Sequence, residues 1–200
     1  MLPKVSRMTR MKQMDAVKRH IRLSMELVMC MVCAMAFGLA AVAVNFAPLF
    51  YGNDFAYSGT LMMPLAFTLL SIGFANVIRT QWVLPQGRDT IFVHSVLTGA
   101  VINLIANFVL IPPFGAMGAA AATVLAEFSV PAVQFVYLRK ELPYAQYLKT
   151  TGVYCLFGLV MAGVVVLLGH VLPLHGWGKL AVQVIGGAAV VFALLAAVLF

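Results

Sequence analysis

The chain has 200 residues, of which 63% are hydrophobic and only 10% are charged, and its mean hydropathy is +1.01. Soluble proteins carry about 25% charged residues, so this composition excludes a soluble globular domain. It also excludes a disordered chain, because disorder requires low hydrophobicity. Three cysteines in apolar runs are too few for a disulfide scaffold. The lipid bilayer is therefore the solvent of most of this chain.

The net charge of +7 comes almost entirely from residues 1–22, which hold seven basic side chains and one acidic one. No nucleic-acid recognition motif accompanies this charge, so a nucleic-acid partner is not expected. A basic segment beside an apolar helix is typical of the cytoplasmic flank of a membrane protein. We therefore predict a basic cytoplasmic connector over residues 1–22, whose first residues suggest the tail of something longer.

Six apolar runs are long enough to cross a bilayer as helices, for which about 20 residues suffice. Turn-forming residues separate them, and none alternates with the period of two that a membrane β-barrel strand requires. The sequence thus predicts an all-α, polytopic membrane protein. The expected spans lie near residues 23–50, 59–84, 90–111, 115–138, 149–170 and 178–200.

Lysine and arginine predict the orientation of these spans, since cytoplasmic loops carry an excess of both. With residues 1–22 in the cytoplasm, eleven basic residues fall on the cytoplasmic side and only Lys179 falls outside. Both termini are therefore predicted to be cytoplasmic.

Glu127 is the ionisable residue that falls nearest the middle of a span, about 18 Å of helix from either end. Thr123 and Gln134 share its helical face. Pro131 removes the hydrogen bond that the Glu127 carbonyl would otherwise accept. These features indicate either a site for a cation, a proton or a polar substrate, or a protonated carboxyl bonded to a neighbouring helix.

Two further features place polar groups at membrane depth. Ser95, Gly99, Asn103 and Asn107 follow one another at four-residue spacing, which makes one polar, small-residue stripe in the third span. This stripe is either packing between helices or the wall of a wet cavity. Arg79, near the inner end of the second span, either extends to the membrane surface or faces a substrate.

Nothing in the sequence indicates an enzyme or a cofactor. It contains no Ser/His/Asp set, no zinc-protease motif and no phosphate-binding loop. Cys30 and Cys33 share a helix face but lack the second pair of ligands that a zinc site needs, so no metal is expected.

Four motifs occur in the order and spacing found in bacterial polysaccharide and oligosaccharide flippases. They are LPKVS at 2–6, FYGNDF at 50–55, TQWVLPQGRD at 80–89 and NLIANFVLIPPFGAMGAA at 103–120, which Glu127 follows. The chain resembles the C-terminal half of a Wzx-like member of the multidrug/oligosaccharidyl-lipid/polysaccharide exporter superfamily over about residues 1–140.

The resemblance implies the second lobe of a two-lobe exporter, with residues 23–140 as a four-helix part of that lobe and residues 141–200 as two additional helices. It implies translocation of undecaprenyl-linked oligosaccharide from the inner to the outer leaflet of the bacterial inner membrane by alternating access. The substrate-path or coupling candidates are Glu127, Asn103, Asn107, Arg79, Gln134 and Thr123. Besides the lipid-linked substrate and the bilayer, the implied partners are a polysaccharide polymerase and the export machinery.

Two other functions remain open at this point: a cation-coupled multidrug-type exporter of the same architecture, and a membrane scaffold fragment that transports nothing. The polar stripe and Glu127 favour a sugar substrate over an apolar drug. Because the resemblance covers about one lobe of two, we expect these 200 residues not to move lipid-linked sugars alone.

Overall fold

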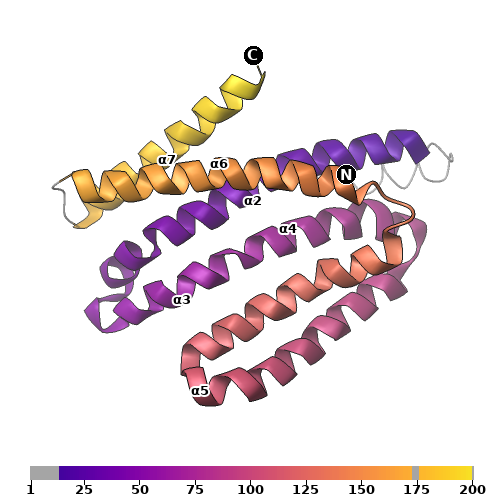
Figure 1. Cartoon of the computed structure of the whole chain (residues 1–200), viewed down its shortest axis with the longest axis horizontal. Coiled ribbons are helices and arrows are strands. Elements are labelled where there is room, and N and C mark those ends of the chain that lie inside the picture. The colour runs from indigo at the N-terminus through magenta and orange to yellow at the C-terminus, as the bar shows by residue number, and fades with distance from the viewer. Residues whose placement is uncertain (1–13, 173–175, 200) are drawn as a thin grey trace.

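The computed structural model describes residues 14–172 and 176–199, and the regular elements in those ranges are all helical (Figure 1). Five helical segments there are long and apolar enough to cross a membrane, which confirms the predicted all-α, polytopic membrane fold. They are α2 (Met14–Tyr51), the segment Asn53–Gln86, α5 (Asp89–Leu138), α6 (Tyr144–Val171) and α7 (Gly176–Leu199).

The α5 helix is a hairpin of two antiparallel arms, and these arms correspond to the third and fourth predicted spans (Figure 1). Two prolines precede the reversal, and Gly115 occupies it with φ 56° and ψ −131°, a region that is open almost only to glycine. Beyond the turn, Gly118 packs against the backbone of Leu110. Further along, Gly99 of the first arm lies against Ala126 of the second.

The second predicted span is one segment built from several short helices. Pro64 removes a backbone donor, the chain kinks at Phe67, and the Thr68 hydroxyl donates a hydrogen bond to the Leu65 carbonyl at 2.7 Å. After α4 the backbone widens into a π-helical turn that begins at Arg79; such turns are frequent at functional sites. The pieces are η1 (Asn53–Phe55), α3 (Ala56–Ala66), α4 (Thr68–Ile78), η2 (Arg79–Val83) and η3 (Leu84–Gln86).

The α2 helix occupies the centre of the fold and contacts α3, α4, α6 and α7. Its buried stripe starts at Val17 and Ile21 and continues at four-residue spacing through Met25, Met29 and Cys33. The first turns of α2 therefore lie inside the predicted connector 1–22, and the helix begins well before the expected start at residue 23. The reason is that the apolar face needs only every fourth residue, so basic side chains can occupy the opposite face.

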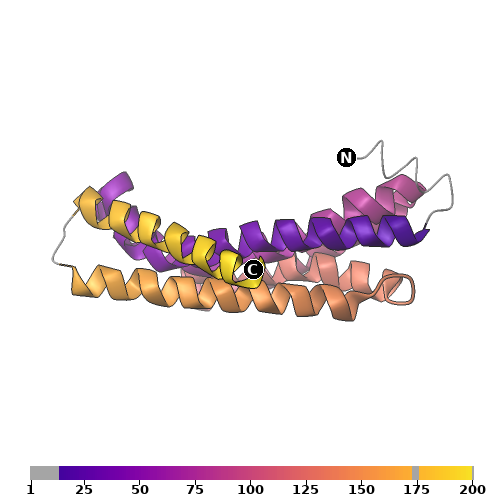
Figure 2. The same cartoon turned by 90° about the horizontal axis from the view of Figure 1, so that it is seen from above.

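The C-terminal helices share the core of α2. The α6 helix runs alongside α2 (Figure 2), where Gly158 leaves room for the ring of Phe37. Gln183 of α7 is buried and donates a hydrogen bond to the Val165 carbonyl of α6 at 3.1 Å, and it accepts one from Asn45 of α2 at 3.5 Å. The sequence showed no signature in these last spans, so Gln183 is a contact that sequence reasoning missed. The division of the chain at residue 140 stays a prediction.

Candidate functional site

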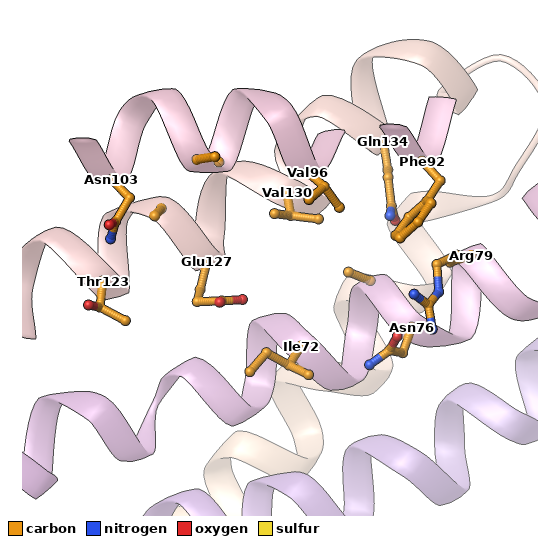
Figure 3. Close-up of a pocket in the computed structure, with 14 residues that line it drawn as sticks. Ile72, Asn76, Arg79, Phe92, Val96, Asn103, Thr123, Glu127, Val130 and Gln134 are labelled. Atoms are coloured by element: carbon orange, nitrogen blue, oxygen red, sulfur yellow. The ribbon is translucent and has the colours of Figure 1, made fainter. Parts of the chain in front are cut away.

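A cavity of about 580 Å³ lies between α4 and the two arms of α5 (Figure 3). Binding pockets in proteins commonly measure about 300–1,000 Å³, so this one can hold a phosphate or sugar group. Its apolar wall includes Ile72, Phe92 and Val96. Its polar lining comes from Asn76, Arg79, Asn103, Thr123, Glu127 and Gln134.

Five of the six candidate residues from the sequence line this cavity, and the sixth lies next to it. Asn107 does not reach the cavity, but its amide donates a hydrogen bond to the side-chain oxygen of Asn103 at 3.0 Å. The stripe of the third span therefore serves two purposes: Gly99 and Asn103 form cavity wall, whereas Ser95 is fully buried and bonds the Phe92 carbonyl of its own helix at 2.8 Å. The role of these residues in substrate binding or coupling stays a prediction.

Thr123, Glu127 and Gln134 lie on one face of the second α5 arm, as their spacing predicts, and all three border the cavity (Figure 3). The Thr123 hydroxyl donates a hydrogen bond to the Ala119 carbonyl at 3.0 Å. Gln134 is 1% exposed, and its side-chain oxygen has no hydrogen-bond partner among the described residues. A carbonyl oxygen this deeply buried without a partner is costly, so the Gln134 oxygen can accept a hydrogen bond from a ligand.

The carbonyl of Glu127, which Pro131 leaves without its helical donor, has found a donor on another helix. The buried hydroxyl of Ser71 on α4 donates a hydrogen bond to it. The carbonyl freed by Pro131 therefore already has a donor in the described structure, and its part in a ligand site stays a prediction. A hydroxyl of the neighbouring helix thus takes the place of the missing helical donor, and Glu127 lines the cavity.

We expect Ser71→Ala to reduce the free energy of unfolding by about 1–2 kcal/mol, because it leaves the Glu127 carbonyl without a donor in a buried place. The measurement is thermal unfolding of the purified protein in detergent. Ser129→Ala is the matched control, since the Ser129 hydroxyl bonds the Ala126 carbonyl within its own helix at 2.6 Å and does not join two helices. If both variants lose the same stability, the hydrogen bond between α4 and α5 contributes no more than one within a single helix.

Arg79 faces the cavity, which was one of its two predicted orientations. Its guanidinium carbon lies 4.7 Å from the centre of the Phe92 ring, a cation–π arrangement. Its Nε atom is buried and has no hydrogen-bond partner among the described residues. Sequence reasoning missed two cavity residues beside Arg79. One is Phe92, and the other is Asn76, which precedes Arg79 by one turn on α4. Asn76 could have been predicted from the sequence, because a residue three positions before Arg79 lies on the same helix face.

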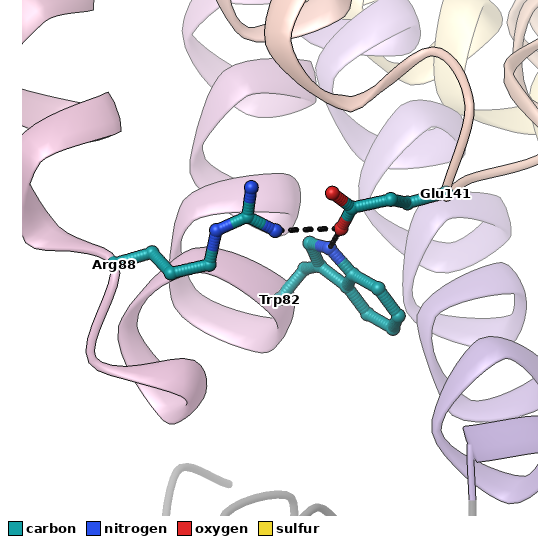
Figure 4. Close-up of polar contacts among 3 residues, drawn as sticks. All are labelled: Trp82, Arg88 and Glu141. Atoms are coloured by element: carbon teal, nitrogen blue, oxygen red, sulfur yellow. Dashed lines mark hydrogen bonds and ion pairs between the residues drawn. The ribbon is translucent and has the colours of Figure 1, made fainter.

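A second polar cluster joins two loops at one end of the helices (Figure 4). Arg88, just before α5, donates to the Glu141 carboxylate at 2.6 Å, and the indole nitrogen of the buried Trp82 donates to the same oxygen at 3.1 Å. Burial raises the pKa of Glu141, but the hydrogen bonds from Arg88 and Trp82 and the charges of Arg88 and Lys18 outweigh it and lower that pKa. The cluster therefore fixes the start of the α5 hairpin to the loop that follows its end.

This lowered pKa predicts how the cluster responds to acid. A carboxylate whose pKa is lower in the folded state stabilises the fold above its ordinary pKa of about 4.3, and that contribution disappears as the pH falls through the lowered value. We expect Glu141→Gln to reduce stability at pH 7 by at most about 1 kcal/mol, because the pair is partly exposed. The difference between wild type and variant should therefore shrink as the pH falls through this lowered pKa.

The measurement is the melting temperature in detergent between pH 7 and pH 3. Asp54→Asn is the control, because Asp54 is exposed and belongs to neither ion pair of the described residues. A gap between wild type and Glu141→Gln that stays constant with pH would contradict the assigned ion pair.

Comparisons with known proteins agree with this architecture. The family model described as "Lipid II flippase MurJ" matches residues 1–186. A solved structure titled "Lipid II flippase MurJ, inward closed conformation" superposes with a TM-score of 0.77 at 16% sequence identity. The superposition covers 94% of this chain and 40% of that chain, so the present chain spans well under half of that relative. None of the curated proteins matches the sequence significantly.

The match refines the resemblance found in the sequence motifs. The family model is that of a lipid II flippase, and it does not single out the Wzx-like polysaccharide branch that the motifs suggested. At 16% identity the structural likeness shows the fold alone, but the family model covers most of the chain. The chain belongs to the lipid II flippase MurJ family.

Proposed function

We propose that this chain forms the C-terminal part of a path that moves a polyprenyl-linked saccharide precursor across the bacterial inner membrane. The observation that carries this proposal is a polar cavity, with Arg79 and Glu127 in its lining, in a chain of the lipid II flippase family. Flippases move their substrate without breaking a covalent bond, so the proposal assigns no catalytic group. Because the chain spans 40% of the solved relative, the complete path includes helices beyond these 200 residues.

The chemistry of the cavity suits such a substrate. A lipid-linked saccharide keeps its apolar tail in the bilayer, while its polar head would lose hydration in the hydrocarbon at a cost of several kcal/mol per unpaired group. The amides of Asn76, Asn103 and Gln134 can replace water as donors and acceptors. The cavity can therefore shelter a polar head at membrane depth while the tail remains among lipids.

The proposed transport direction runs from the cytoplasmic to the outer leaflet, with both termini in the cytoplasm. The basic-residue bias supports this orientation. The bond between Arg88 and Glu141 also joins, at one end of the helices, the two loops that carry Arg88, Arg139 and Lys140. Reporter fusions after Arg88 and after Lys149 should report the cytoplasm, and a fusion after Asp54 should report the outside. A cytoplasmic signal at Asp54 would overturn this orientation. A fusion after His175, the other external point expected from the sequence, lies outside the described residues.

Depletion of the protein in its native host tests the function and separates two substrates of the same chemical class. For a lipid II substrate, we expect lipid II to accumulate in the inner leaflet and peptidoglycan synthesis to stop. For the polysaccharide repeat unit that the sequence motifs indicate, we expect loss of surface polysaccharide, with its polymerase starved of substrate, while peptidoglycan synthesis continues.

The readout is the leaflet distribution of each radiolabelled precursor, measured with protease or lectin access from outside. Accumulation of neither precursor would overturn the proposal. In that case, new sensitivity to amphiphilic drugs would indicate the multidrug-type exporter, and no phenotype would indicate a scaffold. Re-expression of the wild-type gene must restore translocation, which controls for effects on neighbouring genes.

A further inference from the structure

Arg79 carries a charge inside the membrane for which the described residues provide no counter-ion. The two ion pairs within residues 14–172 and 176–199 are Arg22–Glu26 and Arg88–Glu141, and neither includes Arg79. Stacking on Phe92 satisfies one face of its guanidinium but leaves the planar edge of N–H donors unused. The buried Nε without a partner belongs to that edge. A charged donor set at membrane depth without an acceptor indicates a site for an anion.

The surroundings of Arg79 add neutral hydrogen-bonding groups and no nearby carboxylate. Gln134, almost fully buried and without a partner for its oxygen, and Asn76 lie at the same end of the cavity as Arg79 (Figure 3). Glu127 and Thr123 lie toward the other end. Glu127 precedes Gln134 by seven residues, which is about 10 Å along the helix. The cavity is therefore polarised, with its positive end at Arg79 and its carboxylate away from it.

We propose that Arg79 binds the diphosphate group of a polyprenyl diphosphate, with the attached saccharide directed toward Glu127. This inference rests on the proposed function and specifies how the head group is held. A guanidinium forms paired hydrogen bonds with phosphate oxygens, and the amide NH2 groups of Gln134 and Asn76 can donate to the same oxygens, while the Gln134 oxygen can accept from a sugar hydroxyl. Sugar hydroxyls directed toward Glu127 can donate to its carboxylate, whereas a diphosphate placed there would be repelled.

The position of Arg79 along its helix agrees with loading from the cytoplasmic leaflet. Arg79 begins the π-turn that leads into the loop before α5, and the proposed orientation places that loop in the cytoplasm. The diphosphate of a membrane-anchored carrier lies at the level of the lipid head groups. Arg79 therefore offers a cation inside the cavity to a diphosphate that has entered past the basic residues of the cytoplasmic loops.

The test measures binding of radiolabelled undecaprenyl diphosphate to the full chain in nanodiscs made of zwitterionic lipid. We expect Arg79→Gln to weaken binding by about tenfold or more, the equivalent of one charge-assisted hydrogen-bond pair. Arg79→Lys should fall between wild type and Arg79→Gln, since a lysine keeps the charge but loses the paired geometry. Arg139→Gln is the matched control, because Arg139 is exposed beyond the end of α5 and does not line the cavity.

A second variant keeps Arg79 in place. Asn76→Asp introduces a carboxylate one turn from Arg79 at an exposed position, where it should pair with the guanidinium and compete with the diphosphate. We expect a loss of binding similar to that of Arg79→Gln without a change in folding, checked by size-exclusion chromatography and circular dichroism. Undecaprenol, which lacks phosphate, should bind wild type and both variants equally.

Competition with inorganic diphosphate tests whether the site recognises the diphosphate group itself or requires the lipid that carries it. Weak competition by inorganic diphosphate that disappears in Arg79→Gln would support recognition of the diphosphate itself. Undecaprenyl diphosphate binding that is equal in wild type and Arg79→Gln would overturn the inference, as would failure of the wild type to bind it. The proposed function has its own test: it is overturned if depletion of the protein in the host causes neither precursor to accumulate.

Discussion

Replacing Gly118 by alanine is expected to destabilise the protein by about 3 kcal/mol or more. Among the glycines of the described structure, an added Cβ atom would come closest to another atom at this position. A Cβ atom at this position would overlap the carbonyl group of Leu110 on the other arm of the α5 hairpin. The obstacle is backbone and not the end of a flexible side chain, so the two arms would have to separate. Overpacking of a well-filled core already costs about 1–3 kcal/mol when side chains can adjust.

The measurement is the melting temperature in detergent, together with the fraction of extracted protein that remains monodisperse. Gly152→Ala is the matched control, because a Cβ atom there would meet nothing within 4 Å and alanine favours helix over glycine. We expect this control to equal or exceed wild type. Similar stability of Gly118→Ala and wild type would mean that the arms do not approach each other at this turn.

Replacing Glu127 by glutamine is expected to leave folding and membrane insertion largely intact but to reduce transport severalfold or more. The amide keeps the shape of the side chain, and the hydrogen bond from Ser71 goes to the backbone carbonyl, which the substitution does not change. What is lost is the ionisable carboxyl group in the cavity lining. Glu127→Ala should lose stability as well, because it also removes the hydrogen-bonding groups of the side chain.

Transport is measured in the native host as outward movement of the lipid-linked precursor, normalised to the amount of protein in the membrane. Glu26→Gln is the matched control: its carboxylate is 40% exposed on α2, lies 3.8 Å from Arg22 and does not line the cavity. Wild-type transport by Glu127→Gln would show that Glu127 has a structural role, which is the other interpretation that the sequence left open.

Much of the candidate site could be predicted because polar residues are rare in membrane spans. Glu127, Gln134 and Thr123 were assigned to one face from helical spacing alone, and the structure places them along one cavity. Asn103 followed from a four-residue repeat by the same reasoning. A polar side chain in hydrocarbon must find a partner or a cavity, so residues of this kind gather wherever the helices leave polar space.

The contacts between distant residues could not be predicted. Pro131 shows from the sequence that the Glu127 carbonyl loses its helical donor, but only the packing of α4 on α5 reveals that Ser71 replaces that donor. The direction of Arg79 was equally open, because its long side chain can extend to the membrane surface or stack on a ring that comes from another helix. That α2 is already helical and buried at Val17 and Ile21 could not be read from the sequence, because these side chains are covered by residues elsewhere in the chain.

The sequence by itself determined that the chain crosses the membrane as helices, where its long apolar runs lie and which helix faces are polar. The reason is that backbone groups in hydrocarbon must bond within their own segment, so apolar length and helical spacing suffice to predict the segments. Tertiary structure alone decided which helices pack against each other and which buried polar atoms have no hydrogen-bond partner. Those outcomes depend on side chains dozens of residues apart, such as Ser71 and Glu127, that meet only when the helices pack.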